Sequence, residues 1–162
     1  MNNALTLNEL ANEIKKQKST LILCHKNPDP DTLGSAFALK HILLHLGMNA
    51  EVACCDLAQR KFDFITGGAK LEYTGKKYER YIAVDVASPA QLGELEFLAP
   101  SVDITIDHHA MNTRFSSYYE SFRASCAENI YLLAEELGIL DTLPINFYEC
   151  LYAGMSADTG GF

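Results

Sequence analysis

Short apolar segments alternate along this chain with longer amphipathic ones, and this alternation limits the folds open to it. The apolar segments predict strands at 20–24, 50–54, 81–86 and 103–106. The amphipathic segments have the 3.6-residue period of helices and cover 7–16, 33–46, 90–98, 124–137 and 145–155. Apolar strands that alternate with helices favour a mostly parallel sheet covered on both faces. We therefore predict an α/β fold with helices on both faces of the sheet.

Local signals mark the ends of several predicted elements. The sequence from Thr6 to Glu9 is a capping box that begins the first helix, and Gly47 is a plausible C-cap of the second. Segment 26–31 contains two prolines and is predicted to be irregular. Four large apolar residues are expected in the core: Phe115, Phe122, Tyr131 and Met155.

Length and charge exclude several classes of protein. The 162 residues match one domain, and a hydrophobic fraction of 48% is enough for a full core. The net charge of −8 and the lack of a basic stripe argue against a long nucleic-acid duplex as partner. The longest apolar runs are far too short to span a membrane, and segment 1–17 is too polar for a secretory signal.

The cysteines indicate the compartment. Their number is five, most lie in apolar stretches, and no Cys-x-x-Cys spacing occurs. An odd count of this kind predicts reduced, buried thiols in a cytoplasmic protein rather than disulfides or a zinc site.

Acidic and histidine residues gather where the predicted strands end. They are His25, Asp29 and Asp31 after the first strand, Asp85 in the third, Asp107, His108 and His109 after the fourth, and Asp158 after the last helix. An isolated acidic residue in a loop is usually a turn or cap residue. Asp85 lies in an apolar strand, where an unpaired carboxylate is costly to bury. It must be paired, lie at the end of its strand, or bind a cation.

Together these side chains predict a site for divalent metal ions. Imidazole and carboxylate ligands suit Mn²⁺, whereas the absence of thiolates disfavours structural zinc. The set is large enough to hold two ions if Asp85 bridges them. Two ions about 3.5–4 Å apart activate water and clamp a phosphoryl group. The residues alone therefore predict hydrolysis of a phosphate ester or anhydride.

Four ordered motifs resemble those of the DHH phosphoesterase superfamily. They are His-x-x-x-Asp-x-Asp-x-x-Gly-Ser at 25–35, Asp85, Asp-His-His at 107–109 and Asp-Thr-Gly at 158–160. They extend over nearly the whole chain, and their common order is more specific than any single motif. The resemblance implies a Rossmann-like DHH domain and a metal-dependent phosphoesterase.

The resemblance also implies roles for individual residues. Two Mn²⁺ ions would share six ligands, with His25, Asp29 and Asp85 on the first ion and Asp31, Asp85, His108 and Asp158 on the second. Asp107 would orient an imidazole ligand through its other ring nitrogen. His109 would face the substrate phosphate or protonate the departing oxygen. Mg²⁺ is the alternative metal, although imidazole ligands favour Mn²⁺.

Two branches of related phosphohydrolases compete for this sequence. The opening His-Lys-Asn-Pro-Asp at 25–29 also resembles family II inorganic pyrophosphatases. Segments 106–115, 124–128 and 158–162 instead resemble the nanoRNase and pAp-phosphatase branch, whose members hydrolyse short oligoribonucleotides, 3′-phosphoadenosine 5′-phosphate (pAp), or linear and cyclic dinucleotides. Asn112, Arg114 and Ser35 are the candidate substrate-binding residues, although an arginine after a turn is more often a surface residue and Ser35 could instead cap a helix.

In this branch a linker and a DHH-associated substrate-binding domain normally follow the catalytic domain. No Gly-Gly-Gly-His-type motif of that second domain occurs in the sequence, so we expect residues 1–162 to be the DHH catalytic domain without it. Three interpretations follow: a domain of a DHH phosphodiesterase, a pyrophosphatase-like hydrolase, or a non-catalytic metal-binding regulatory module. The resemblance also suggests a homodimer.

Overall fold

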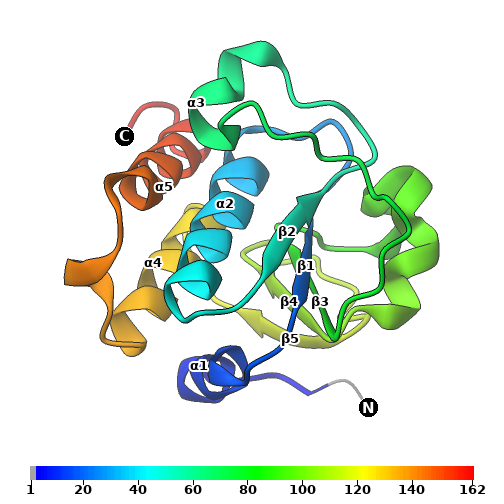
Figure 1. The fold of residues 1–162 in the computed structure, drawn as a ribbon, viewed down its shortest axis with the longest axis horizontal. Coiled ribbons are helices and arrows are strands. Elements are labelled where there is room, and N and C mark those ends of the chain that lie inside the picture. Colours follow the sequence, from blue (N-terminus) through cyan, green and yellow to red (C-terminus); the bar gives the residue numbers. More distant parts are fainter. Residues whose placement is uncertain (1–2) are drawn as a thin grey trace.

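Five parallel strands form the centre of the fold (Figure 1). The computed structural model describes residues 3–162. The strands are β1 (Thr20–Leu23), β2 (Ala50–Ala53), β3 (Arg80–Val84), β4 (Ile104–Asp107) and β5 (Ser117–Glu120), in the spatial order β2-β1-β3-β4-β5. The predicted parallel α/β architecture is confirmed.

Side chains that alternate along the strands separate two apolar layers. Ile22 of β1 faces the core built with α1 (Leu7–Lys15), α2 (Pro30–His45), α4 (Cys126–Glu136) and α5 (Ile145–Asp158). Its neighbours Leu21 and Leu23 face the opposite layer, where Leu92, Leu95 and Leu98 pack. Those leucines belong to the 3₁₀ segment η2 (Pro89–Ser101). The sheet is thus covered on both faces, by α-helices on one and by 3₁₀ turns on the other.

The second cover differs from the predicted α-helix at 90–98. Gly93 adopts φ 58° and ψ −128°, which interrupts the segment and divides it into two tight turns. A Cβ atom at Gly93 would lie 2.6 Å from Cys55 Sγ, so only glycine fits both this backbone conformation and this contact. The periodicity of the leucines is correct, but the helix type is not.

Four short elements have no counterpart in the sequence prediction. They are β5, the helix α3 (Asp63–Thr66) with the preceding turn η1 (Arg60–Phe62), and the turn η3 (Leu140–Thr142). The strand β5 has the sequence Ser-Tyr-Tyr-Glu, which lacks the continuous apolar character of the other strands. It is an edge strand, and its outer side pairs with the N-terminal segment through the bonds Leu5 N to Tyr118 O and Tyr118 N to Asn3 O.

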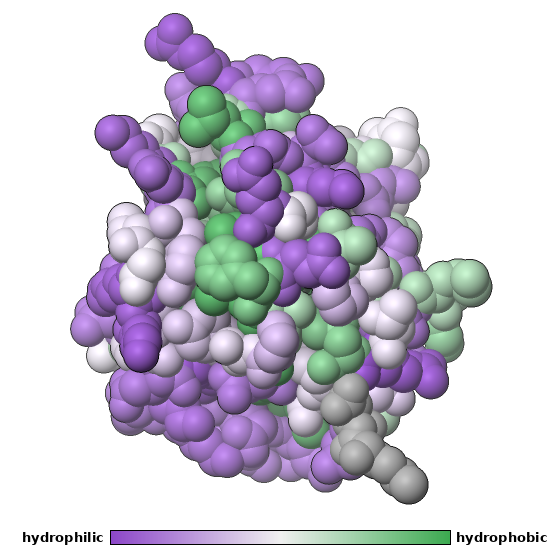
Figure 2. Space-filling model, turned by 90° about the vertical axis from the view of Figure 1, so that its right-hand side faces the viewer, coloured by the Kyte–Doolittle hydropathy of each residue, from purple (hydrophilic) through white to green (hydrophobic). Residues whose placement is uncertain are grey.

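Two of the four large residues that were predicted to be in the core lie at the surface instead. Phe122 is 77% exposed and Tyr131 is 36% exposed, whereas Phe115 and Met155 pack partly buried against the core. Phe122 lies in the loop after β5. The face seen in Figure 2 is mostly hydrophilic, with hydrophobic residues in small separate groups. Within residues 3–162, no helix combines the length and the apolar character needed to cross a membrane.

A buried arginine fixes α1 against the sheet at the end opposite the strand carboxyl termini. Arg80, the first residue of β3, is 2% exposed. Its guanidinium donates to the carbonyl oxygen of Glu13 at 2.7 Å and to Thr20 Oγ1 at 2.9 Å. It thereby adds a donor at the end of α1, where the last carbonyl groups lack a full set of helical partners.

We expect Arg80→Met to lower the free energy of unfolding by at least about 2 kcal/mol, because buried acceptors lose their donor. Lys76→Met is the matched control: Lys76 forms an exposed ion pair with Glu51, which is expected to contribute at most about 1 kcal/mol. Denaturant unfolding measures both variants. Equal stability of the two variants would contradict the role given to Arg80.

Candidate metal centre

The predicted site residues meet at the topological switch point of the sheet, between β1 and β3. From β1 the chain continues to β2 on one side, while β3 lies on the other side of β1. His25 follows β1, Asp85 follows β3, and Asp107 ends β4. Ligands of parallel α/β sheets bind at this kind of switch point, outside the carboxyl ends of the strands.

The segment predicted to be irregular contains the start of a helix. Helix α2 begins at Pro30, because a proline fits the first helical position and needs no N–H partner there. Asp29 is the N-cap, and its Oδ1 accepts hydrogen bonds from the N–H groups of Asp31 at 2.9 Å and Thr32 at 3.0 Å. The prediction for 26–31 was therefore wrong in its last two residues. Asp29 Oδ2 remains directed at His25.

Asp31 is held by the N-terminus of a different helix. Its Oδ2 accepts from Cys126 N at 2.7 Å and its Oδ1 from Ala127 N at 3.0 Å, both at the start of α4. Ser35, one turn further along α2, is fully buried, and its Oγ lies 3.5 Å from Asp31 Oδ1. Ser35 therefore supports Asp31 and does not reach the surface, which corrects its prediction as a substrate contact at a helix start.

Two glycines allow α5 to approach closely enough to complete the site. A Cβ at Gly34 would lie 2.3 Å from the Cys150 carbonyl oxygen, and one at Gly154 would lie 2.7 Å from Asp31 Oδ1. Helix α5 continues to Asp158, beyond the predicted end at residue 155, so Asp158 belongs to its last turn. Gly154 had no assigned role from sequence, although an isolated glycine in a helical pattern commonly has a packing reason.

Two histidine rings are oriented in the same way. The Nδ1 atoms of His25 and His108 lie 2.7 Å and 3.2 Å from the backbone oxygens of Lys26 and Arg123. If each Nδ1 carries the proton, each Nε2 presents a lone pair, as in metal-binding histidines. His25 Nε2 lies 3.4 Å from Asp29 Oδ2 and 3.5 Å from Asp85 Oδ2.

The second imidazole faces three carboxylates. His108 Nε2 lies 3.3 Å from Asp85 Oδ1, 3.3 Å from Asp158 Oδ2 and 3.6 Å from Asp31 Oδ2. Asp85 therefore contacts both histidines, one through each carboxylate oxygen. The predicted metal ligands are brought together in two groups, His25–Asp29–Asp85 and Asp31–His108–Asp158, with Asp85 between them.

Asp85 is the most constrained residue of the cluster. It is 2% exposed and adopts a left-handed φ of 58°, a conformation that costs a non-glycine residue of order 1–3 kcal/mol and is most frequent at functional sites. Its Oδ1 and the facing Nε2 of His108 are both buried without a hydrogen bond that satisfies them. Buried polar atoms of this kind need an explanation. A divalent cation between them would satisfy both, so the residues fit a metal ion.

The charges of the cluster also fit a metal ion. Burial lowers the pKa of His25 and His108, but the neighbouring carboxylates, Asp29 and Asp85 for His25 and Asp85 for His108, outweigh it and raise the pKa values to about 10 and about 9. Burial and the charge of Asp85 raise the pKa of Asp31 to about 7. Burial and the same charge raise the pKa of Asp158. Protons thus balance an excess of carboxylates here, and divalent cations would supply the same positive charge.

The remaining predicted catalytic residues form a separate hydrogen-bonded group. Asp107 Oδ1 accepts from His109 Nδ1 at 2.7 Å and from His108 N at 2.8 Å, and Asp107 Oδ2 accepts from Asn112 Nδ2 at 2.6 Å. Asp107 therefore orients the ring of His109 and not that of His25 or His108, contrary to the prediction that it orients a metal ligand. His109 Nδ1 also lies 3.5 Å from Asp85 Oδ1, but Asp107 is much closer.

The two other predicted substrate residues differ in position. The amide of Asn112 is directed at Asp107, next to the cluster. Arg114 is 51% exposed in its side chain, forms a 2.7 Å ion pair with Glu120 and lies over the ring of Tyr118. Its contacts are thus with β5, in agreement with the surface alternative for this arginine.

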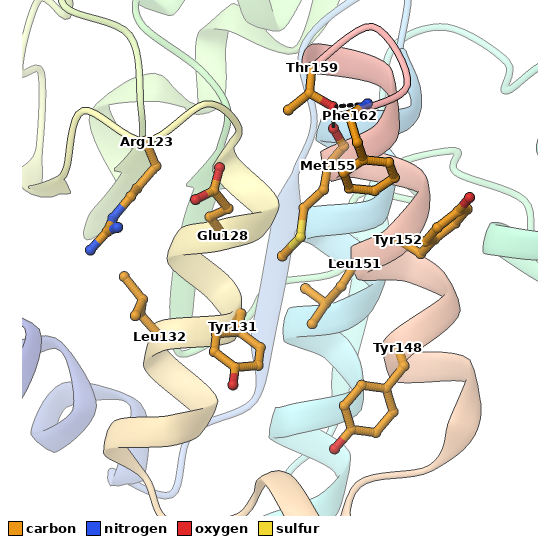
Figure 3. A pocket seen from close by; sticks show the side chains of 10 residues that line it. All are labelled: Arg123, Glu128, Tyr131, Leu132, Tyr148, Leu151, Tyr152, Met155, Thr159 and Phe162. Carbon is orange, nitrogen blue, oxygen red and sulfur yellow. Dashed lines mark hydrogen bonds between the residues drawn. The ribbon is translucent and has the colours of Figure 1, made fainter.

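A large groove lies beside this cluster, not in it. It has a volume of about 640 Å³ between α4 and α5 and is lined by side chains such as Tyr131, Leu151 and Tyr152 (Figure 3). Thr159, which follows Asp158, lies at one end of it. None of the converging imidazoles and carboxylates lines the groove. The chemistry is therefore assigned from the converging side chains and not from the size of a cavity.

We expect Asp158→Asn to weaken Mn²⁺ binding by more than about 10-fold, because it removes one negative ligand while preserving side-chain shape. The metal-free variant should be at least as stable as the parent, since burial and the charge of Asp85 raise the pKa of Asp158, and a neutral amide avoids both penalties. Asp141→Asn, the same change at an exposed position, is the control. Calorimetric titration with Mn²⁺ and thermal unfolding measure the two effects. Unaltered affinity would exclude Asp158 as a ligand.

Some known proteins are similar to this chain in sequence, and some solved structures are similar to it in fold. The probable bifunctional oligoribonuclease and PAP phosphatase NrnA of Streptococcus mutans is 28% identical over 157 residues, which are 93% of this chain and 48% of the relative. The structure of an exopolyphosphatase-related protein from Bacteroides fragilis superposes with a TM-score of 0.87 at 21% identity, covering 96% of this chain and 51% of that one.

A more distant structure was determined with metal. RecJ from Thermus thermophilus, in complex with Mn²⁺, matches with a TM-score of 0.57 at 18% identity over 94% of this chain and 24% of that one. The chain thus spans about half the length of the relatives described above, or less.

The sequence model of the DHH family, N-terminal domain, matches residues 19–155. This segment contains five of the six predicted metal ligands and extends through all five strands. Because the match covers most of the chain, the chain belongs to the DHH family, and the matched part is that family's N-terminal domain.

Proposed function

We propose that this chain is the catalytic, dimetal-binding domain of a Mn²⁺-dependent phosphoesterase. Its substrates would be short oligoribonucleotides, pAp, or linear and cyclic dinucleotides. The observation that carries the proposal is the convergence of two imidazole Nε2 atoms and three other carboxylates on that of Asp85. The similarity to NrnA, named an oligoribonuclease and PAP phosphatase, supports this substrate class. Bound divalent cations would supply a water of lowered pKa and stabilise charge on a phosphoryl group.

The protein's own residues would have distinct roles. One ion would be held by His25, Asp29 and Asp85, and the other by Asp31, Asp85, His108 and Asp158, in line with two of the three groups of ligand atoms that lie within 4.8 Å of one another; the third group is Asp85, His108 and His109. Backbone N–H groups of α2 and α4 fix Asp29 and Asp31 before any ion binds. Such preorganisation lowers the entropy that binding must offset.

His109 is the proposed proton donor. Its Nδ1 is bound to Asp107, and its side chain is 44% exposed beside Asp85. The unbound Nε2 can therefore hold a proton for the departing oxygen while the carboxylate of Asp107 fixes the ring. Asn112 holds the second oxygen of Asp107, so its proposed role is to position this pair rather than to bind phosphate directly.

Further parts of the proposal concern the protein around this domain. A DHH-associated domain outside residues 1–162 would grip the substrate, which fits the half-length match to NrnA. A cytoplasmic location is supported by five free cysteines, four of them buried. A homodimer stays a prediction for sedimentation analysis. Mg²⁺ in place of Mn²⁺, a pyrophosphatase-like activity and a non-catalytic module are the alternatives.

Parallel assays with Mn²⁺ separate these alternatives. We expect release of mononucleotide from pApA or cyclic di-AMP, or of phosphate from pAp, and much slower turnover of pyrophosphate. Turnover of pyrophosphate alone would contradict the proposed substrate class. Mn²⁺ binding without turnover of any of the four compounds, even in the full-length protein, would favour the non-catalytic module.

We expect His109→Ala to lower kcat about 10²–10⁴-fold, the range of general acid catalysis, with Mn²⁺ affinity nearly unchanged. His45→Ala is the control, because His45 is an exposed histidine at the end of α2. Steady-state kinetics and metal analysis of the purified proteins give the two readouts. A His109→Ala protein that contains no metal would show that His109 is a ligand instead.

A further inference from the structure

An asparagine of α4 with no assigned role lies directly behind the proposed site. Asn129 is 0% exposed, although it is a polar residue in the middle of the face that packs on the sheet. Its neighbours on that face, such as Ala127, Ile130 and Leu133, belong to the apolar core. A buried amide among them is costly unless its hydrogen bonds are made.

Both ends of the Asn129 amide have partners. Its Nδ2 donates to the backbone oxygen of Asp107 at 2.9 Å, and its Oδ1 accepts from the hydroxyl of Ser121. Because Ser121 Oγ can donate and a carbonyl oxygen can only accept, these two bonds define the orientation of the amide. Asn129 thereby connects the end of β4 with the loop after β5.

The residue that Asn129 holds is the one that orients His109. Asp107 accepts the His109 Nδ1–H at 2.7 Å, and it lies at the last position of β4, opposite Glu120 of β5. The same helix, α4, holds Asp31 at its N-terminus through Cys126 N and Ala127 N. One rigid helix therefore sets the distance between a proposed metal ligand and the proposed proton donor.

The geometry points to Asn129 as a positioning residue for the Asp107–His109 pair, an inference that rests on the proposed function of His109. Asn129 does not touch substrate or metal in this role. It holds the backbone of Asp107, so that the carboxylate meets the imidazole Nδ1 and the opposite nitrogen is directed at the reacting phosphate. Catalysis depends steeply on this kind of alignment.

A residue that only stabilises the core would behave differently from a positioning residue. Its loss would lower the unfolding temperature but leave the His109–Asp107 hydrogen bond intact in the protein that remains folded. The decisive readout is therefore the imidazole Nδ1–H proton of His109, observed by NMR in protein labelled with ¹⁵N-histidine, with Mg²⁺ as a diamagnetic ion. His109→Ala identifies the signal.

Two variants and two controls complete the experiment. Asn129→Leu removes both hydrogen bonds at similar volume, and Asn129→Asp keeps the acceptor for Ser121 but removes the donor to Asp107. Ser121→Ala tests the other bond, and Asn12→Leu makes the same change on an exposed face of α1.

We expect the His109 signal to exchange with water at least about 10-fold faster, or to disappear, in Asn129→Leu and Asn129→Asp. In the active protein, kcat should fall about 10- to 100-fold while KM and Mn²⁺ affinity stay within about threefold. Asn12→Leu should match the parent, and Ser121→Ala should have a smaller effect. An unchanged signal in folded Asn129 variants, or no such signal in the parent, would overturn the inference. Because the NMR readout needs no turnover, failure of the proposed activity is distinguishable from failure of this role.

Discussion

Carboxylates are buried at the carboxyl ends of the strands, and the need to neutralise their charge explains much of this structure. Asp85 directly follows the central strand β3, in a strained backbone conformation, and is almost fully buried, with three other carboxylates of the cluster nearby. Like charges at these distances raise one another's pKa unless positive charge is supplied. Two imidazoles supply it here, each with its other nitrogen bound to a backbone oxygen. Divalent cations would supply the same positive charge, and this is why the cluster is a proposed metal site.

The surrounding helices are arranged to hold those carboxylates and not merely to cover the sheet. Helix α2 begins one residue after Asp29, α4 directs its first N–H groups at Asp31, and α5 approaches through Gly34 and Gly154. Helix N-termini favour negative charge, so each of the first two offsets part of the repulsion within the cluster. Folding and preorganisation of the site are thus largely one event, because the contacts that pack α2, α4 and α5 are the contacts that orient Asp29, Asp31 and Asp158.

The sequence contains enough information to predict the sheet class and the set of converging side chains, because strand period and strand-end position are local properties. It does not reveal the partners of those side chains. The bond from Asp107 to His109 rather than to a ligand imidazole depends on how the turn after β4 closes. The burial of Ser35 depends on where α2 starts. Asn129 looks like an ordinary surface residue until α4 is placed on β4. Strand β5 was missed because its sequence lacks continuous apolar character; it is held by pairing with β4 and, on its outer side, with the N-terminal segment.

The acidic composition can also be understood from the site. The net charge is −8, and four of the acidic residues belong to the cluster around Asp85, so two divalent cations would offset four of those eight charges. A protein that binds phosphates through cations needs no basic stripe, and the remaining negative surface repels long polyanions whose backbone extends beyond the site. Selection for short substrates would then follow from charge, because only the reacting phosphate and its close neighbours come within reach of the cations. The acidic surface is therefore consistent with the proposed short substrates.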